Sequence, residues 1–122
     1  MNNKHKILYV DDEKINRTIF EIVFASKYDI FIASDGYEGL NILDENPDIL
    51  IVISDMSMPG LNGIEFIEKA KEAHPLKKYY MLSGFQITPE IETKIEDGLI
   101  LKYFEKPLNK KEIETEIEKH NN

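Results

Sequence analysis

The sequence predicts a doubly wound α/β domain, in which a five-stranded parallel sheet with strand order 2-1-3-4-5 has helices on both faces. Two observations support this fold. Short apolar stretches alternate with amphipathic stretches of helix length along the whole chain. The stretch Ile49-Leu50-Ile51-Val52-Ile53-Ser54 shows no polar alternation, which is typical of a strand buried on both faces of a parallel sheet. Five such strands joined by right-handed helical crossovers fit this order.

The first half of the chain predicts three strands and two helices. Apolar side chains recur at helical spacing after residue 14, which indicates an amphipathic first helix. We expect Ser34 to cap the second helix and Pro47 to end it. The third strand runs directly into Asp55. In order, the expected elements are strand 6–10, helix 14–25, strand 29–33, helix 37–45 and strand 49–54.

The second half begins with a loop, residues 56–63, that is rich in turn-forming residues. Its residues Gly60, Asn62 and Gly63 are expected to allow left-handed backbone conformations beside Asp55. A proline is acceptable in the first turn of a helix, so Pro89 is expected to open the fourth one. The expected elements are helix 64–73, strand 79–83, helix 89–97, strand 101–105 and helix 110–119.

Composition limits the classes of protein that fit. A chain of 122 residues suits one domain, expected to span 1–122 without an output domain. The net charge of −8 argues against nucleic-acid binding through a broad basic surface. The absence of cysteine excludes disulfides, thiolate metal sites and thiol catalysis. Only four apolar residues, 7–10, precede the first acid, too few for a signal peptide or membrane span, and we expect a cytoplasmic protein.

Acidic residues follow two of the predicted strands. Asp11 and Asp12 follow the first strand and Asp55 follows the third, and these strands are neighbours in the predicted order. Because ligands of such sheets bind at the carboxyl ends of the strands, we expect a metal site there. Oxygen ligands without His or Cys favour Mg²⁺, with Mn²⁺ as an alternative. The alternative for Asp11 and Asp12 is helix capping.

Two further polar residues follow strands four and five. Lys106 comes directly after the fifth strand and precedes Pro107, a pair that often has a cis or constrained bond. Ser83 ends the fourth strand. Taken singly, Lys106 suits a solvated charge and Ser83 suits a turn. Together with the acids they suit phosphoryl transfer to a carboxylate, in which Asp55 attacks in line while the metal and Lys106 neutralise the phosphoryl oxygens.

With these residues in view, the chain resembles a bacterial response-regulator receiver domain, the CheY-like phosphoacceptor of two-component signalling. The resemblance covers essentially all 122 residues. It rests on Asp11-Asp12, Asp55, Met58-Pro59-Gly60, Gly63, Ser83-Gly84, Tyr103 and Lys106-Pro107.

The resemblance implies a role for each matching residue. Asp55 would accept the phosphoryl group, and Lys106 would bond it. Asp11, Asp12 and Asp55, with the backbone carbonyl of Ser57, would hold Mg²⁺. No other cofactor is expected, and the only chemistry would be slow self-dephosphorylation.

The resemblance also implies a switch. Ser83 would move toward the phosphoryl group, and the ring of Tyr103 would turn inward, changing a surface formed by helix four, strand five and helix five. Phe85 occupies a position that influences access of the hydrolytic water. The implied partners are a sensor histidine kinase or histidine phosphotransfer protein and a downstream protein, with the chain a monomer or a phosphorylation-dependent dimer.

Three other functions share parts of this pattern. A degenerate receiver would bind partners without phosphorylation, although retention of Asp55 and Lys106 weighs against it. A flavodoxin-like cofactor binder would share the fold, but Asp11-Asp12 stands where a phosphate-binding loop is needed. A metal-dependent phosphatase is less favoured because no second general acid or base is apparent.

Overall fold

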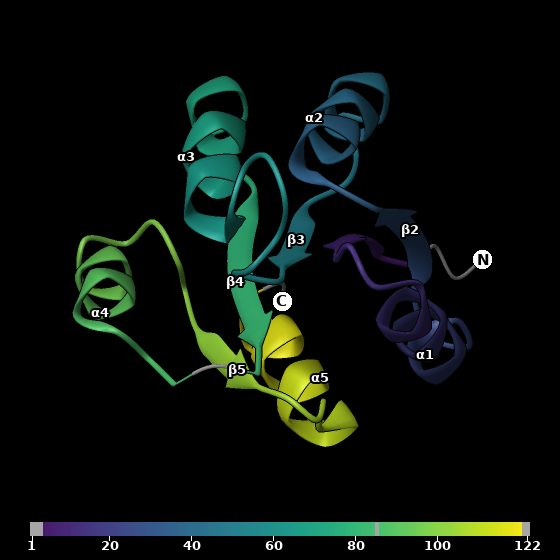
Figure 1. The fold of residues 1–122 in the computed structure, drawn as a ribbon. Coiled ribbons are helices and arrows are strands. Elements are labelled where there is room, and N and C mark those ends of the chain that lie inside the picture. Colours follow the sequence, from purple (N-terminus) through teal and green to yellow (C-terminus); the bar gives the residue numbers. More distant parts are fainter. Residues whose placement is uncertain (1–3, 85, 121–122) are drawn as a thin grey trace.

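The computed structural model describes residues 4–84 and 86–120, and it confirms the predicted α/β fold (Figure 1). Strands and helices alternate from one end to the other. In chain order, the elements are β1 (Lys6–Val10), α1 (Lys14–Phe24), β2 (Asp29–Ala33), α2 (Gly36–Glu45), β3 (Ile51–Ser54), α3 (Gly63–Ala73), β4 (Lys78–Ser83), α4 (Pro89–Glu96), β5 (Tyr103–Glu105) and α5 (Lys110–His120).

All neighbouring strands pair in parallel in the order β2-β1-β3-β4-β5, as the sequence predicts. In the register of the sheet, Val10 pairs with Ser54 across β1 and β3, and Ser83 pairs with Glu105 across β4 and β5. Residues that follow these strands therefore emerge at one edge of the sheet, which is where the sequence places its acids and Lys106.

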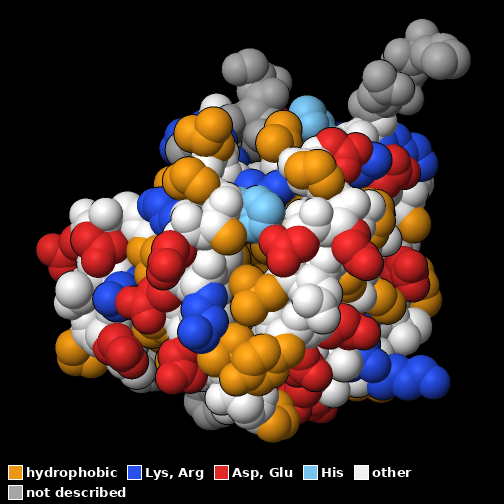
Figure 2. Space-filling model, turned by 90° about the horizontal axis from the view of Figure 1, so that it is seen from above, with side chains coloured by type: hydrophobic (Ala, Val, Ile, Leu, Met, Phe, Trp, Pro, Cys, Tyr) orange, Lys and Arg blue, Asp and Glu red, His pale blue; other side chains and the backbone are white. Residues whose placement is uncertain are grey.

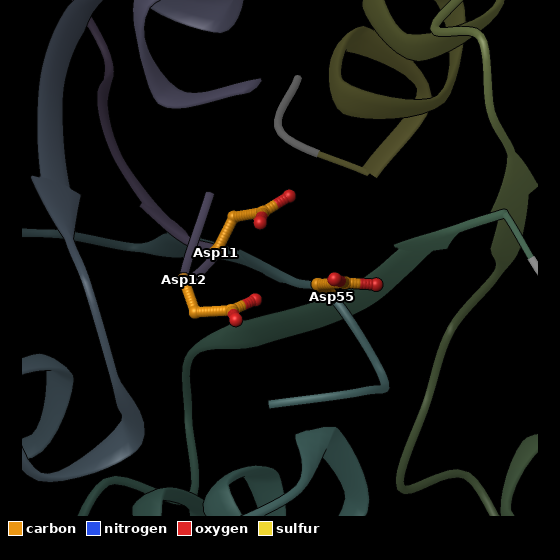
Figure 3. Close-up of side chains that lie close together, drawn as sticks. All are labelled: Asp11, Asp12 and Asp55. Atoms are coloured by element: carbon orange, nitrogen blue, oxygen red, sulfur yellow. The ribbon is translucent and has the colours of Figure 1, made fainter. Parts of the chain in front are cut away.

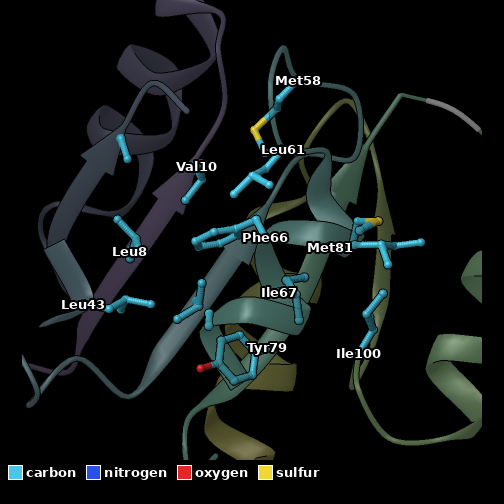
Figure 4. Packing of buried hydrophobic residues seen from close by; sticks show 14 of the residues in the cluster. Leu8, Val10, Leu43, Met58, Leu61, Phe66, Ile67, Tyr79, Met81 and Ile100 are labelled. Atoms are coloured by element: carbon cyan, nitrogen blue, oxygen red, sulfur yellow. The ribbon is translucent and has the colours of Figure 1, made fainter. Parts of the chain in front are cut away.

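Each face of the sheet has its own hydrophobic core. One core joins alternate strand residues to α2, α3 and α4, with Phe66 of α3 fully buried at its centre (Figure 4). The other core joins the remaining strand residues to α1 and α5 through fully buried side chains such as Phe20 and Ile113. Figure 1 shows α2 and α3 on the opposite side of the sheet from α1 and α5. A strand buried on both faces needs the continuous apolar sequence seen in β3.

Two of the predicted strands are longer than the strands in the structure. β3 begins at Ile51, because Ile49 and Leu50 belong to the connection from α2, and Leu50 is 46% exposed. β5 begins at Tyr103, since Leu101 pairs through only one backbone bond, from its N–H to the Tyr79 carbonyl. An unbroken apolar run predicts that a strand is buried, but it does not predict at which residue the hydrogen bonding of the strand begins.

The predicted cap of α2 is wrong by one residue. Asp35, not Ser34, is the N-cap, and its side chain accepts a hydrogen bond from the backbone N–H of Glu38. The carboxylate of Glu38 in turn accepts from the backbone N–H and the hydroxyl of Ser34. Both residues are favoured at helix starts, so their order in the chain could not decide between them.

The loop between β3 and α3 differs from the prediction in its backbone. Of the three residues expected to allow left-handed conformations, Gly60 alone adopts one, with φ of 77°. Asn62 is the N-cap of α3 and forms a capping box with Glu65. Gly63 is needed for space, because a Cβ atom there would lie 2.3 Å from the backbone carbonyl oxygen of Asp55. The glycine therefore lets α3 begin directly against the end of β3.

Acidic and hydrophobic side chains are interleaved on the face of the molecule that Figure 2 shows, with Lys and Arg scattered among them. This face has no continuous basic patch of the kind that binds nucleic acid. Among the helices of the described residues, none has the length and apolar character needed to span a membrane.

Candidate functional site

The carboxylates of Asp11, Asp12 and Asp55 lie together at the carboxyl edge of the sheet (Figure 3). Each offers one oxygen, and these oxygens all lie within 4.8 Å of one another. The pairing of the backbone causes this proximity. The N–H of Asp55 donates to the carbonyl of Val10, so the acidic residues that follow β1 and β3 lie side by side. The structure brings together all three acids that the sequence singles out.

The three carboxylates differ in their exposure to solvent. Asp11 is fully buried, Asp55 is 6% exposed and Asp12 is exposed. Asp12 and Asp55 border a cleft of about 400 Å³, and Ser57, Lys106 and Gly84 border the same cleft. The cleft is large enough for a hydrated ion and a phosphoryl group, with Asp12 and Asp55 at its surface and Asp11 beneath it.

Both carboxylate oxygens of Asp11 have hydrogen-bond donors. Oδ1 accepts from the backbone N–H of Glu13 at 2.9 Å. Oδ2 accepts from the hydroxyl of Tyr9 at 2.6 Å and from the ammonium of Lys106 at 2.8 Å. The capping alternative does not describe this arrangement, because the N-cap of α1 is Glu13 and no side chain caps that helix.

Lys106 connects the two ends of the chain at the site. Its Nζ lies 2.8 Å from Oδ2 of Asp11 and 3.5 Å from Oδ2 of Asp55. Burial opposes the charged form of Lys106, but the hydrogen bond to Asp11 and the two carboxylate charges outweigh it and raise the pKa of the ammonium. The peptide bond between Lys106 and Pro107 is cis. The structure thus places this lysine against the acids rather than in solvent.

The pKa of Asp55 lies above its ordinary value of 3.8. Burial is the largest cause, and the nearby charge of Asp11 adds to it. Lys106, the backbone N–H of Met56 and the hydroxyl of Ser83 oppose the rise without cancelling it. The N–H of Met56 donates to Oδ1 at 2.8 Å. Asp55 is therefore a carboxylate whose charge this site does not fully neutralise, and an added cation would favour the ionised form.

Ser83 and Tyr103 lie next to Asp55 from the other side. Ser83 ends β4 and is fully buried close to Asp55 and Tyr103, and the Tyr103 hydroxyl is buried without a hydrogen-bond partner among the described residues. Tyr103 begins β5 and is only 8% exposed. Burial raises the pKa of the Tyr103 phenol, and the Ser83 hydroxyl opposes that rise. The ring thus already has the inward position that the resemblance assigns to the switched state. Phe85, the remaining position expected near the site, lies outside the described residues.

Sequence reasoning missed two contributors to the site. The sequence predicts Tyr9 only as a core residue of the first strand. In the structure its hydroxyl also reaches Asp11, because residues two apart on an extended chain point to the same face. Its phenol stays protonated, since burial and then the Asp11 hydrogen bond raise its pKa. The sequence predicts only a flexible loop at Gly63, whereas its missing side chain makes room for the Asp55 carbonyl.

The donor set fits a hard divalent cation. Asp11, Asp12 and Asp55 supply carboxylate oxygens, and the loop that carries Ser57 borders the same cleft. Mg²⁺ keeps several waters and needs few protein carboxylates, which suits a cleft open on one side. The carboxylates also repel one another until a cation joins them. An acidic Asp11–Asp12–Asp55 cluster of this kind is typical of the magnesium site of receiver domains.

Comparison with known proteins gives a consistent result. A family model described as the response regulator receiver domain matches residues 7–118. The sporulation initiation phosphotransferase F of Bacillus subtilis is 31% identical over 117 residues, covering 94% of this chain and 92% of that protein. The two-component response regulator ORR11 of Oryza sativa is 28% identical over 95 residues, which cover 75% of this chain. That alignment spans 65% of the rice protein's own length.

The solved structures agree with the sequence comparisons. A response regulator receiver domain protein from Clostridium thermocellum superposes with a TM-score of 0.87 at 27% identity, covering 94% of this chain and 92% of that one. The chemotaxis protein CheY4 of Vibrio cholerae has the same fold, with a TM-score of 0.86 at 22% identity over 96% of this chain and 98% of that one.

Proposed function

This chain belongs to the response regulator receiver family of two-component signalling, and we propose that it is a phosphoacceptor module in which Asp55 receives the phosphoryl group. One observation carries the proposal. Asp55 lies at a cleft between a cation, Lys106, and two further carboxylates, with only 6% of its surface exposed. A carboxylate at such a position can be reached by a phosphodonor from the cleft. On its other side lie the charges of Lys106 and the two further carboxylates.

The proposed reaction is an in-line displacement at phosphorus. A carboxylate oxygen of Asp55 forms a bond to the phosphorus while the bond from phosphorus to the donor breaks, and the electron pair leaves with the donor. The ammonium of Lys106 shifts from Asp11 toward the new phosphoryl oxygens and neutralises them. The buried hydroxyl of Ser83 is the second donor for these oxygens.

Asp11, Asp12 and Asp55, with the backbone carbonyl of Ser57, would hold Mg²⁺. The ion would neutralise charge on the equatorial phosphoryl oxygens. Mn²⁺ has the same preference for oxygen ligands and is proposed as a substitute. Because the chain's own groups hold and orient the phosphoryl group without a second general acid or base, the module would not turn over a substrate, apart from slow loss of its own phosphoryl group.

The proposed output is a change at Ser83 and Tyr103. A phosphoryl group adds negative charge and three acceptor oxygens at the edge of the sheet, and Ser83 bonds it directly. Tyr103, which lies close to Ser83, would pass this change to the surface of α4, β5 and α5. The phosphodonor would be a histidine kinase or a histidine phosphotransfer protein, and the target a protein that binds this surface.

Residues 1–122 would form one receiver domain, located in the cytoplasm, and the chain would be a monomer or would dimerise on phosphorylation. A receiver that binds partners without phosphorylation has the same fold, and it is distinguished only by the chemistry of Asp55.

Intact-mass measurement tests the proposal. Wild-type protein incubated with a small phosphodonor and Mg²⁺ is expected to gain one phosphoryl group, and Asp55→Asn none. The matched control is Asp29→Asn, which changes an exposed carboxylate at the opposite end of the sheet and is expected to behave like wild type. An unmodified wild-type chain, or an adduct that persists in Asp55→Asn, would contradict the proposed function.

A further inference from the structure

We propose that Tyr9 is a positioning residue of the phosphorylation site, whose hydroxyl holds the carboxylate of Asp11 in place when Lys106 turns to the phosphoryl group. The inference rests on the proposed function of Asp55. It assigns to a core aromatic residue a role that neither its burial nor its place in β1 would suggest.

The position of the Tyr9 hydroxyl is fixed by packing. The side chain is 1% exposed, and its ring stacks on Phe20 with centroids 4.2 Å apart and planes 9° from parallel. Rings packed in this way have few alternative rotamers, so the hydroxyl has a defined place. It lies 2.6 Å from Oδ2 of Asp11. The donor is thus rigid, whereas the other donor to this oxygen is the end of a long lysine side chain.

The shared acceptor gives Tyr9 its proposed function. Oδ2 of Asp11 accepts from both Tyr9 and Lys106, while Oδ1 accepts from the backbone N–H of Glu13. When Lys106 moves toward a phosphoryl group on Asp55, Oδ2 loses its ammonium. Asp11 is fully buried, and a buried carboxylate oxygen that loses its donors is destabilising, because no water replaces them. The Tyr9 hydroxyl remains as the protein donor to that oxygen and keeps the carboxylate oriented toward the cleft.

Lys106 has the space that this exchange requires. Its side chain borders the cleft at Asp55 and also a second cavity of about 550 Å³ that Tyr9 lines. Its Nζ lies 2.8 Å from Oδ2 of Asp11 and 3.5 Å from Oδ2 of Asp55, so the ammonium is already close to both carboxylates. A small movement therefore transfers the ammonium from one carboxylate to the other.

Other tyrosines in the same core show that the contact is not a general result of burying a phenol. The hydroxyls of Tyr28 and Tyr80 are buried and have no hydrogen-bond partner among the described residues. Tyr80 is fully buried on the same face of the sheet as Tyr9, in the neighbourhood of Phe104. Tyr80→Phe is therefore a matched control that removes a phenolic oxygen from the same core without touching Asp11.

The test measures Mg²⁺ binding by calorimetry, and then half-saturation by beryllofluoride, a phosphoryl mimic, at saturating Mg²⁺. Tyr9→Phe keeps the stacked ring and is expected to weaken both by about tenfold, the lower range for loss of a hydrogen bond to a metal-site carboxylate. Tyr80→Phe is expected to leave both within twofold of wild type. Thermal midpoints of the two variants show whether either one loses folded structure.

Repeating the measurement in an Asp11→Asn variant tests whether Tyr9 affects Mg²⁺ affinity through Asp11. In Asp11→Asn protein, Tyr9→Phe is expected to cause no further loss of Mg²⁺ affinity, since the hydroxyl acts through that carboxylate. Wild-type affinities in Tyr9→Phe, or an undiminished loss in the Asp11→Asn background, would overturn the assignment of Tyr9. Failure of wild-type protein to bind Mg²⁺ and beryllofluoride would instead overturn the proposed function on which it rests.

Discussion

The ammonium of Lys106 lies 2.8 Å from Oδ2 of Asp11, a residue 95 positions earlier in the chain. The two meet because β1 and β5, although separated by β3 and β4 in the sheet, end at the same edge. Asp55 directly follows β3, and its Oδ2 lies 3.5 Å from the same ammonium. One cation thus serves two buried carboxylates, and the site has an excess of negative charge that a divalent ion would offset.

Removing this cation is expected to slow phosphorylation. Lys106→Met keeps the length of the side chain but leaves Asp11 and Asp55 without their ammonium, so charge that develops on the phosphoryl oxygens is not neutralised. We expect a loss of about a hundredfold in the rate with a small phosphodonor at saturating Mg²⁺, as for other charge-stabilising donors. Lys102→Met, which removes a half-exposed lysine that pairs with Glu116, is the control. A Lys106→Met rate within twofold of the control would exclude this role.

The raised pKa of Asp55 predicts a pH-dependent gain in stability for Asp55→Asn. Below the ordinary pKa of 3.8 the carboxyl is protonated in the folded and unfolded protein alike, and it has no effect. Above that value the unfolded protein ionises first, because folding raises the pKa, so wild-type stability falls as the pH rises through the raised value. The penalty is fully present at higher pH.

Asn has no such penalty. In metal-free buffer at pH 7 we expect Asp55→Asn to melt a few degrees above wild type, where about 4 °C corresponds to about 1 kcal/mol for a chain of this size. The difference is expected to shrink as the pH is lowered toward 4. Thermal unfolding followed by circular dichroism at several pH values measures it. A variant that melts below wild type at pH 7 would show that Asp55 is stabilised, not destabilised, by its surroundings.

Mg²⁺ is expected to reverse this penalty. An ion that binds only the folded protein stabilises it by about 2.7 kcal/mol at a hundred times its Kd. The thermal midpoint of wild type should therefore rise with Mg²⁺ concentration and return on chelation. Asp12→Asn removes the exposed carboxylate of the cluster and is expected to lose most of the effect, whereas Asp29→Asn retains it. An equal rise in both variants would place the ion elsewhere.

The position of the acids could be predicted from the sequence because it depends on topology alone. Once β1 and β3 are neighbours in a parallel sheet, residues that follow them share an edge, and Asp11 and Asp55 need no further information. Lys106 needs the additional fact that β5 ends there too. The alternation of strands and helices already predicts the strand order, and the strand order places these three residues at one edge of the sheet.

The contacts of Tyr9 and Gly63 could not be predicted in this way. Tyr9 fits a buried strand whether or not its hydroxyl has a partner, as Tyr80 shows in the same core. Gly63 looks like any loop glycine until α3 is placed against the Asp55 carbonyl. The start of β3 also differs from the prediction, because Leu50 is as apolar as its neighbours but is 46% exposed. These features depend on how each residue is placed against its neighbours in the folded chain, which the residue type alone does not determine.

The proximity of Ser83 to Tyr103 predicts a route by which phosphorylation of Asp55 affects β5. Beryllofluoride with Mg²⁺ is expected to shift the amide NMR signals of both residues in wild type. In Ser83→Ala protein the shift at Tyr103 should decrease strongly, because the hydroxyl that links the phosphoryl site to the ring is missing. Signals from Lys6 to Leu8, at the far end of β1, are the internal control. An unchanged Tyr103 response in Ser83→Ala would rule out this route.

The most direct test of the account is to locate the phosphoryl group chemically. Borohydride reduces an aspartyl phosphate to homoserine, so treatment of phosphorylated wild-type protein, followed by peptide mapping, marks the acceptor. We predict homoserine at position 55 and an unchanged residue at positions 11 and 12. Homoserine at position 11 or 12, or none in protein that has gained a phosphoryl group, would contradict the assignment of Asp55 as the phosphoacceptor.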